Sequence, residues 1–303
     1  MTWSRRELLI TAAAGSLLTA GPGQPAAAAT RRWRGTALGA RAEIAVAGAN
    51  NELADQLIAR ARTEVRRLES VFSLHLSESA ISRLNAQGYL EAPPFELVDL
   101  LTQARDIHAV TDGAFDPTIQ PLWRHLHDLA TGRTPQAALE TARAAIGYEN
   151  VRVSTSRIEF ALPGMALTLN GIAQGYITDK IADIFRTAGL SCLASLGEQR
   201  GVGRIPDGNP WTTRVPGSNG GAGQEMSLSD KAVAVSDPTA LRLGDAGHIL
   251  DPRGSRHEIP THRVAVRAER ATEADGFSTA LALMMPDETQ RVTIASDLEV
   301  WRM

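Results

Sequence analysis

Residues 167–179 read LTLNGIAQGYITD, and this stretch decides how the chain is expected to fold. Leucines at alternate positions, Leu167 and Leu169, predict a short strand, and the residues after Gly171 predict a long helix that ends near Leu190. Small residues between a strand and a helix leave backbone N–H groups exposed, an arrangement that binds phosphate in many proteins. The stretch contains neither of the common glycine-rich nucleotide motifs, so close packing of strand on helix is an open alternative.

The segments on either side of this stretch show helix and strand patterns in turn. Apolar residues recur every three or four positions in the helical segments and every second position in the strands. Helices are expected at 51–72, 95–111, 135–146 and 274–285, and strands at 34–46, 151–153, 158–162, 233–235, 248–250, 263–266 and 292–294. The order lacks a regular strand–helix–strand repeat, so the fold class is predicted as α+β.

The composition is that of one sizeable globular domain. The chain has 303 residues, 43% of them hydrophobic, and a formal net charge of −3. A nucleic-acid-binding protein would show a basic face, which this balance does not supply. After the first thirty residues, no apolar run is long enough to span a bilayer. The single cysteine, Cys192, has no partner for an internal disulfide and is interpreted as a small buried apolar residue.

The first thirty residues, MTWSRRELLITAAAGSLLTAGPGQPAAAAT, have the pattern of an export signal. Arg5 and Arg6 form a charged start, the apolar run that follows is short, and residues 26–29 are the small residues that signal peptidases cut. SRRELL, with the arginine pair in register, is typical of the twin-arginine signal, and an ordinary secretory signal is the alternative. We therefore expect residues 1–29 to be removed and residues 30–303 to form the exported domain.

Three further clusters carry residues that suit chemistry. TDGAFDPT at 111–118 places two carboxylates on the loop after a helix, which a simple helix C-cap would also explain. HILDPR at 248–253 could contact a pyrophosphate or carry a proton through His248, or mark a strand-to-turn corner. In EADGFST at 273–279, Asp275 and Thr279 are one helical turn apart, so they share a face. A carboxylate and a hydroxyl so placed suit Mg²⁺, and plain N-capping is the alternative.

The order of the clusters is more informative than any one of them. FSL at 72–74 with SESAISRLN at 77–85, then TDGAFDPT, GIAQGY, HILDPR and ADGFSTAL, resembles the FAD:protein FMN transferases, the ApbE family, from about Leu38 to Met285. The form LNGIAQGY, the LGE at 196–198 and the twin-arginine signal are most similar to the NosX-like branch, which is associated with maturation of nitrous oxide reductase.

This resemblance implies an α+β fold in which mixed and antiparallel sheets pack with helices, in the T-fold-like architecture of flavin transferases. It implies a Mg²⁺-dependent transferase that moves the FMN moiety of FAD onto a threonine or serine of an exported acceptor protein and releases AMP. FAD would be the donor substrate, and the periplasm the location. A membrane-bound NosR-like flavoprotein is one candidate acceptor, and neither nucleic acid binding nor a membrane span is expected.

The resemblance also assigns residues to roles. Asp275 and Thr279, with the backbone oxygen of Gly171, match the residues that bind the metal. His248 matches a histidine near the pyrophosphate and, like Asp275, is a candidate catalytic residue. Which of the two takes the proton of the acceptor hydroxyl stays open. The residues expected to contact FAD are Leu38, His75, Ala114, Phe115, Asp116, Thr168, Gln174, His248 and Ile249.

Several positions depart from the family pattern. Gln174 stands where many members have lysine, which removes a positive charge from the phosphate region but keeps a donor. His75 stands where a tyrosine commonly packs on the flavin, and Thr168 lacks a nearby aspartate. These departures leave two other functions open. One is a non-catalytic protein that binds or delivers FAD, and the other is a Mg²⁺-dependent pyrophosphatase that hydrolyses FAD to FMN and AMP.

Overall fold

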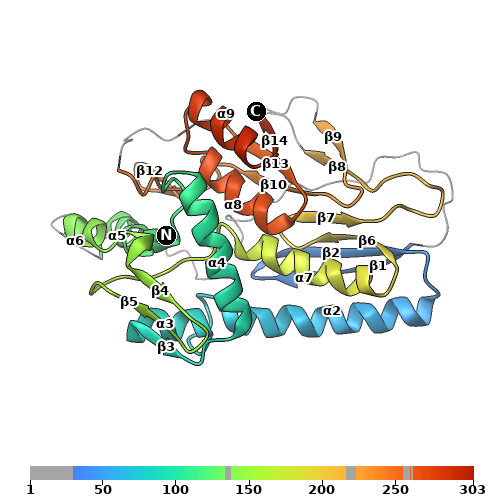
Figure 1. Cartoon of the computed structure of the whole chain (residues 1–303), viewed down its shortest axis with the longest axis horizontal. Coiled ribbons are helices and arrows are strands. Elements are labelled where there is room, and N and C mark those ends of the chain that lie inside the picture. The colour runs from blue at the N-terminus through green and yellow to red at the C-terminus, as the bar shows by residue number, and fades with distance from the viewer. Residues whose placement is uncertain (1–29, 134–137, 216–222, 255–259, 261) are drawn as a thin grey trace.

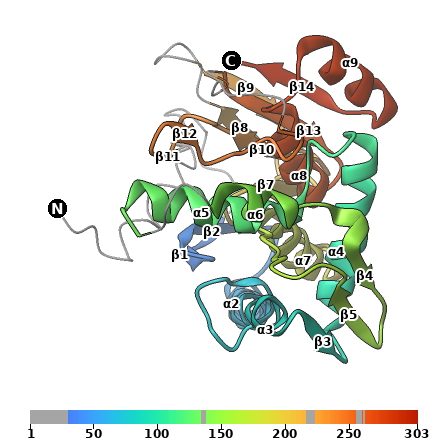
Figure 2. The same ribbon diagram turned by 90° about the vertical axis from the view of Figure 1, so that its left-hand side faces the viewer.

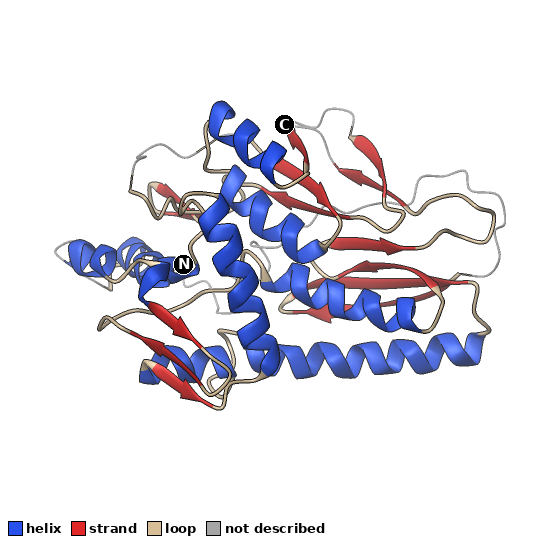
Figure 3. Cartoon of the chain, in the orientation of Figure 1, coloured by secondary structure: helices blue, strands red, loops and turns tan. Residues whose placement is uncertain are grey.

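The computed structural model describes residues 30–133, 138–215, 223–254, 260 and 262–303. The predicted export signal, residues 1–29, lies outside this part of the chain. The described residues form helices and antiparallel strands without a regular alternation, and the helices lie beside the sheets (Figure 3). The predicted α+β class is therefore confirmed.

A seven-stranded sheet forms the centre of the fold (Figure 1). Its strands lie in the order β1-β2-β6-β7-β10-β13-β14, and each neighbouring pair is antiparallel. The strand region expected at 34–46 lies within the hairpin of β1 and β2. The strands are β1 (Arg31–Ala37), β2 (Ala40–Ala47), β6 (Ser191–Ser195), β7 (Gln199–Val202), β10 (Ala232–Ser236), β13 (Val264–Ala268) and β14 (Glu299–Arg302).

Alternation along the strands gives the sheet two buried faces. In β2, Ile44 and Val46 belong to one hydrophobic core, while Ala45 between them belongs to the other. In β13, Val266 and Ala265 are divided in the same way. Successive side chains of a strand point to opposite faces of a sheet, so each face needs its own cover.

Helices cover the first face. α7 (Ala173–Thr187) packs on β6 and β7, α8 (Ala271–Leu281) packs on β10 and β13, and α2 (Asn51–Phe72) packs against β1 and α7. The prediction for 51–72 is confirmed at both ends. The other helices are α3 (Ala80–Gln87), α4 (Phe95–Val110), α5 (Gln120–Ala130), α6 (Leu139–Ala144) and α9 (Pro286–Ala295), with short 3-10 turns η1 (Pro117–Ile119) and η3 (Tyr148–Asn150).

A hairpin covers part of the second face. It consists of β8 (Thr212–Val215) and β9 (Gln224–Ser227), and Trp211, Met226 and Leu228 beside it are buried against the sheet. The indole N–H of Trp211 donates to the hydroxyl of Ser191, 2.8 Å away, which satisfies the polar atom of this large side chain. Packed apolar side chains therefore fill this part of the second face. The predicted functional residues lie on elements other than β8 and β9.

Two smaller sheets complete the architecture. One has the order β3-β5-β4, formed by β3 (Tyr89–Glu91), β5 (Arg157–Phe160) and β4 (Val151–Val153). The strands predicted at 151–153 and 158–162 correspond to β4 and β5, which pair antiparallel. The other is the pair of β11 (Arg242–Leu243) and β12 (Ala246–Gly247).

The predicted strand at 167–169 is wrong, although the helix after it is confirmed. Residues 167–169 belong to no strand, and their hydrogen bonds go to groups outside any sheet. The N–H of Leu167 donates to Asn85 Oδ1 at 2.7 Å, and Asn85 Nδ2 donates back to the Leu167 carbonyl at 2.8 Å. The N–H of Thr168 donates to the Pro117 carbonyl at 2.8 Å. A side-chain amide and one carbonyl thus replace the neighbouring strand.

Two other predicted strands are also wrong. At 248–250 the chain has already left β12, and His248 turns back to the carbonyl of Leu241. At 292–294 the chain is in α9. Pro286 occupies the first turn of this helix, and the backbone N–H of Met285 donates to the side-chain carboxylate of Glu288. Proline at the first turn and a capping carboxylate favour a helix over the β-branched pattern that suggested a strand.

Of the helix expected at 135–146, the described residues form α6 (Leu139–Ala144). Residues 134–137 lie outside the described chain. The longer helix in this region, α5, was not predicted from the sequence. Its apolar residues Leu122, Leu126 and Leu129 recur at helical spacing, so periodicity would have identified it.

Two predictions about the whole chain concern membranes and the cysteine. Among the described residues, each helix is too short or too polar to span a bilayer. Cys192 lies fully buried on β6, and burial raises the pKa of its thiol to about 12. The interpretation of Cys192 as a buried apolar residue is confirmed.

Candidate active site

Two helices bring together the three residues predicted to bind the metal. α7 begins two residues after Gly171, and α8 carries Asp275 and Thr279 one turn apart. The hydroxyl of Thr279 lies 3.4 Å from the carbonyl oxygen of Gly171. The N–H of Gly175, in the first turn of α7, donates to Asp275 Oδ2 at 2.9 Å. A carboxylate, a hydroxyl and a backbone carbonyl from distant parts of the chain therefore meet between α7 and α8.

The Asp275 carboxylate is held in an environment that disfavours its charge. The residue is 4% exposed, and burial raises the pKa of its carboxyl to about 7, with a further increase from the negative charge of Asp179. Glu198, at the turn between β6 and β7, also has a raised pKa, because it is desolvated and close to Asp275. Two acids with raised pKa values on neighbouring elements suit a site that receives a cation.

The donor set fits Mg²⁺ that is shared with phosphates. Within the residues that the structure describes, no group of three His, Cys, Asp or Glu side chains is arranged to hold a metal. A closed cage of protein ligands is therefore not what these residues build. Mg²⁺ commonly takes one or two carboxylates from the protein and completes its shell with substrate phosphates and water. Asp275, Thr279 and Gly171 match that mode.

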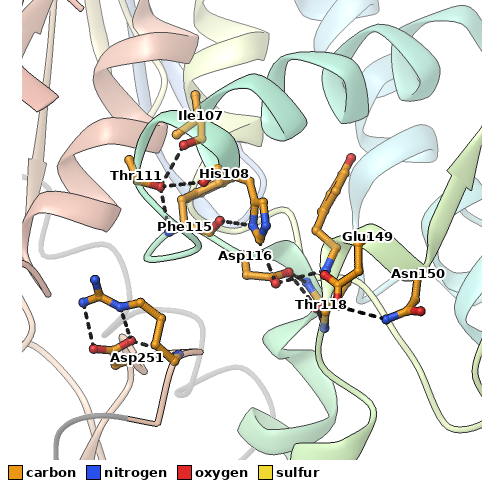
Figure 4. A network of polar contacts seen from close by, with 12 residues as sticks. Ile107, His108, Thr111, Phe115, Asp116, Thr118, Glu149, Asn150 and Asp251 are labelled. Atoms are coloured by element: carbon orange, nitrogen blue, oxygen red, sulfur yellow. Dashed lines mark hydrogen bonds and ion pairs between the residues drawn. The ribbon is translucent and has the colours of Figure 1, made fainter. Parts of the chain in front are cut away.

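The loop after α4 adopts the turn that its sequence predicts. Asp112 and Gly113 have positive φ angles of 48° and 77°, the left-handed conformation that ends a helix. The hydroxyl of Thr111 donates to the carbonyl of Ile107 at 2.7 Å and accepts from the N–H of Phe115 at 3.2 Å (Figure 4). Ala114 is also buried. The loop is thus locked at both ends by one threonine.

Asp116 anchors this loop to the rest of the protein. Its Oδ1 accepts from both the N–H and the hydroxyl of Thr118, at 2.8 and 2.6 Å, and its Oδ2 accepts from the N–H of Tyr148 at 3.2 Å. His108 lies beside it, with Nδ1 3.6 Å from Oδ2 (Figure 4). Burial raises the pKa of Asp116 despite these donors. A direct contact between Asp116 and the flavin stays a prediction. In the structure, the hydrogen bonds of Asp116 fix the loop.

Contacts between the loops join the sequence motifs into one region. The N–H of Thr168 donates to the carbonyl of Pro117, which links residues 167–175 to residues 111–118. A β-carbon on Gly113 would lie 4.0 Å from Arg253 Cγ, so HILDPR reaches the same loop. Figure 2 views the molecule from the side where α5 and the β11–β12 hairpin face the viewer, with α7 behind them. The four motifs therefore meet in space as well as in family order.

His248 is held as a neutral imidazole with one free lone pair. Its Nδ1 lies 3.2 Å from the carbonyl oxygen of Leu241, and its backbone N–H donates to the same oxygen. A carbonyl only accepts, so Nδ1 carries the hydrogen and Nε2 is left as an acceptor. Burial lowers the pKa of His248, which favours the neutral form. This protonation pattern suits a general base. Ile249, half-buried, follows it in the chain.

Two predicted flavin contacts lie at the end of α2. Leu38 occupies the β1–β2 turn with a positive φ of 47°, and its N–H donates to Glu69 Oε1 at 2.7 Å. His75 is exposed in the loop after α2, where its N–H donates to Ser73 Oγ at 3.3 Å. The structure connects this pair to the other motifs through α3, because Asn85 of α3 bonds Leu167.

Gln174 lies at the start of α7 against the β6–β7 turn. A β-carbon on Gly197, whose φ is 104°, would lie 2.6 Å from Gln174 Cδ, so the amide packs across this glycine. Glu198 follows directly in the chain and lies near Asp275. The sequence motif LGE contained Glu198, but the sequence alone did not assign it a role. Its signal was an acid at a turn between two apolar segments.

These observations define an α+β enzyme. Its candidate site has a buried acid and a hydroxyl between α7 and α8, and His248 lies on the loop that follows β12. The chain belongs to the ApbE family, whose model matches residues 38–301. The family predicted from the motif order is confirmed. The NosX-like branch stays a prediction.

Individual relatives agree with this family. An FAD:protein FMN transferase of Klebsiella pneumoniae is 26% identical over 312 residues, covering 92% of this chain and 85% of the relative. One of Salmonella typhimurium is 26% identical over 308 residues, covering 91% and 85%. The crystal structure of the flavinyl transferase ApbE of Pseudomonas stutzeri, 24% identical, superposes with a TM-score of 0.79 over 92% of both chains. The predicted flavin transferase fold and enzyme class are confirmed.

Proposed function

We propose that this protein is a Mg²⁺-dependent FAD:protein FMN transferase that attaches FMN to a threonine or serine of an acceptor protein and releases AMP. The observation that carries the proposal is the meeting of Asp275, Thr279 and the Gly171 carbonyl between α7 and α8. The names of the curated relatives support FAD as the donor and a protein as the acceptor.

The reaction is a phosphoryl transfer. The acceptor hydroxyl oxygen forms a bond to the phosphorus of the FMN half, and the bond from that phosphorus to the bridging oxygen breaks, so AMP leaves with the electron pair. The hydroxyl proton passes to a base. Such transfers depend mainly on positioning and on neutralising charge. Mg²⁺, when bound, supplies positive charge to the pyrophosphate and the leaving group.

His248 is the base that the geometry favours. Its Nε2 is free to accept while Nδ1 is held by the Leu241 carbonyl, and its lowered pKa keeps it unprotonated. Asp275 is a weaker candidate because one of its oxygens already accepts from Gly175 and because its carboxyl suits a cation. Ala114 and Phe115 are assigned to the flavin, on the loop that Thr111 and Asp116 hold in place.

The proposal is tested with purified protein, FAD, MgCl₂ and an FMN-binding acceptor domain, read by in-gel flavin fluorescence. The acceptor with its target threonine replaced by alanine is the matched control. We expect flavin fluorescence on the acceptor that keeps its target threonine and none on the alanine variant. Tight FAD binding with an unlabelled acceptor would favour the non-catalytic flavin carrier. Free FMN formed at the same rate with either acceptor would favour the pyrophosphatase.

We also propose that the protein is exported by the twin-arginine route and acts in the periplasm. The support is the pattern of residues 1–29, in which Arg5 and Arg6 are the residues the export receptor reads. Replacing both by lysine is expected to leave the full-length protein in the cytoplasm, as cell fractionation would show. A variant that is exported and processed like the wild type would contradict this route.

A further inference from the structure

α8 is capped by a residue of another helix. Its own N-cap residue, Arg270, has an extended backbone with φ −117° and ψ 145°, and within the described chain its side chain makes no capping bond. Asp179 of α7 does this work instead. Its Oδ1 accepts from the N–H of Ala271 at 2.9 Å, and its Oδ2 accepts from the N–H and hydroxyl of Thr272 at 3.0 and 2.6 Å. A carboxylate there also complements the positive end of the helix dipole.

Asp179 is fully buried, and Arg200 compensates its charge. Arg200 Nη1 of β7 lies 2.7 Å from Asp179 Oδ1, and Arg270 Nε lies 3.4 Å from Oδ2. Arg200 is itself only 8% exposed. A buried carboxylate is tolerated when it is paired and fully hydrogen-bonded, and loss of one partner is then strongly felt. One side chain thus joins α7, β7 and α8.

The contacts between α7 and α8 form three evenly spaced pairs. Gly171 meets Thr279, Gly175 meets Asp275, and Asp179 meets Ala271. Each step moves four residues forward on the first segment and four residues back on α8. The helices are therefore antiparallel and share one register. The first two pairs make the candidate cation site, and the third pair, at Asp179, is the cap.

We propose that Asp179 is a positioning residue for the cation site, because its cap fixes the register that sets Asp275 and Thr279 opposite Gly171. The proposal rests on the proposed function in one respect, namely that the α7–α8 junction receives Mg²⁺. It goes further by assigning a role to Asp179, the last residue of the stretch LTLNGIAQGYITD, to which the sequence pattern assigned none. Residues that orient metal ligands through a hydrogen bond commonly affect metal affinity strongly.

Asp179→Asn isolates this role. Asparagine has nearly the same volume, but one carboxylate oxygen becomes an NH₂ group that only donates. The new NH₂ group then faces other donors, either the Ala271 N–H and Arg200 or the N–H and hydroxyl of Thr272. The α8 end should shift, and the Mg²⁺ concentration for half-maximal effect should rise about tenfold or more.

The experiment measures melting temperature of the mature protein with saturating FAD and no acceptor, across a MgCl₂ titration. Asp183→Asn is the matched control, because Asp183 lies one turn further on α7 and pairs with Arg200 and Arg186. Ile158→Ala in β5 controls for general loss of stability, because Ile158 is fully buried in another sheet. Both controls should keep the wild-type half-saturating concentration.

Arg270→Ser added to Asp179→Asn provides the rescue. Residue 270 already has the extended backbone of an N-cap, and serine there can cap α8 from within. The double variant should recover most of the lost Mg²⁺ response. An unchanged Asp179→Asn, an Ile158→Ala shift of the same size, or wild-type melting that ignores Mg²⁺ would overturn the inference. A wild type that responds to Mg²⁺ but labels no acceptor would instead refute the transferase and leave this role of Asp179 standing.

Discussion

Asp275→Asn is expected to lower the rate of FMN transfer by about a thousandfold or more. A bound metal contributes several kcal/mol of charge stabilisation in the transition state, and each 1.4 kcal/mol is about a factor of ten in rate. Asparagine keeps the volume and can still accept from Gly175, but it removes the one carboxylate of the α7–α8 pairs that faces the proposed Mg²⁺. Transfer to the acceptor, measured by flavin fluorescence at saturating FAD, checks this result.

Although Asp275→Asn should impair transfer, without metal it should make the free energy of unfolding less sensitive to rising pH. Burial raises the pKa of Asp275 to about 7, well above the value of about 3.9 in an unfolded chain. Between these values the folded protein holds a proton that the unfolded chain has released. The contribution of protonated Asp275 to the stability of the fold is therefore complete below about pH 4. It is lost as the pH rises through 7. Asparagine cannot ionise, so Asp275→Asn should lose less stability than wild type between pH 5 and 8 in EDTA.

Glu273→Gln provides the control for the transfer measurement. Glu273 lies on the same helix and is also an acid whose pKa is raised by burial, but it has no part in the proposed site. It should transfer FMN near the wild-type rate. An Asp275→Asn protein that still labels the acceptor, or that needs as little Mg²⁺ as wild type, would remove Asp275 from the mechanism.

Gly175→Ala is expected to have the largest effect on folding. A β-carbon at this position would overlap the backbone oxygen of Ala271 and lie 2.8 Å from Asp275 Cβ. Backbone cannot move aside as a flexible side chain can, so α7 and α8 must separate. Overpacking of this kind costs about 3 kcal/mol, more than alanine gains by its helix propensity. Urea unfolding should show the loss, and transfer should fall with it because the Gly175–Asp275 contact is broken.

Gly276→Ala is the matched control in the facing helix. A β-carbon there would meet Ile107 Cδ1 at 2.5 Å, which is the far end of a side chain that can rotate. The cost should be clearly smaller than at Gly175. Equal costs at the two glycines would show that the close approach of α7 to α8 is not what requires Gly175.

Local patterns in the sequence predict the helices and strands whose stabilising contacts lie within the segment itself. The helix at 51–72 was predicted to the residue because its apolar spacing and the cap at Asn50 act within the segment. The strand at 167–169 was wrong because the partner of Leu167 is the side chain of Asn85, which lies 82 residues away. A pattern of two leucines cannot distinguish that partner from a strand.

The sequence predicted only those site residues that belong to recognisable motifs, because long-range contacts leave no local pattern. The motif order placed Asp275, Thr279 and Gly171 together, and the structure brings them together. Asp179 and Glu198 were assigned no role, because their importance depends on contacts with chain far away in sequence. Asp179 caps a helix that begins 92 residues later. No local signal marks such a residue, beyond a buried acid in an apolar helix.

An FMN transferase divides FAD into two halves, FMN fixed to the acceptor and AMP released, in equal amounts. The measurement is the amount of AMP released, by chromatography, against the FMN fixed to the acceptor, by mass spectrometry of the intact protein. One AMP is expected for each acceptor that gains the mass of FMN less one water, and the Asp275→Asn protein should form about a thousandfold less of both products in the same time. AMP released with no gain of mass on the acceptor would contradict this expectation.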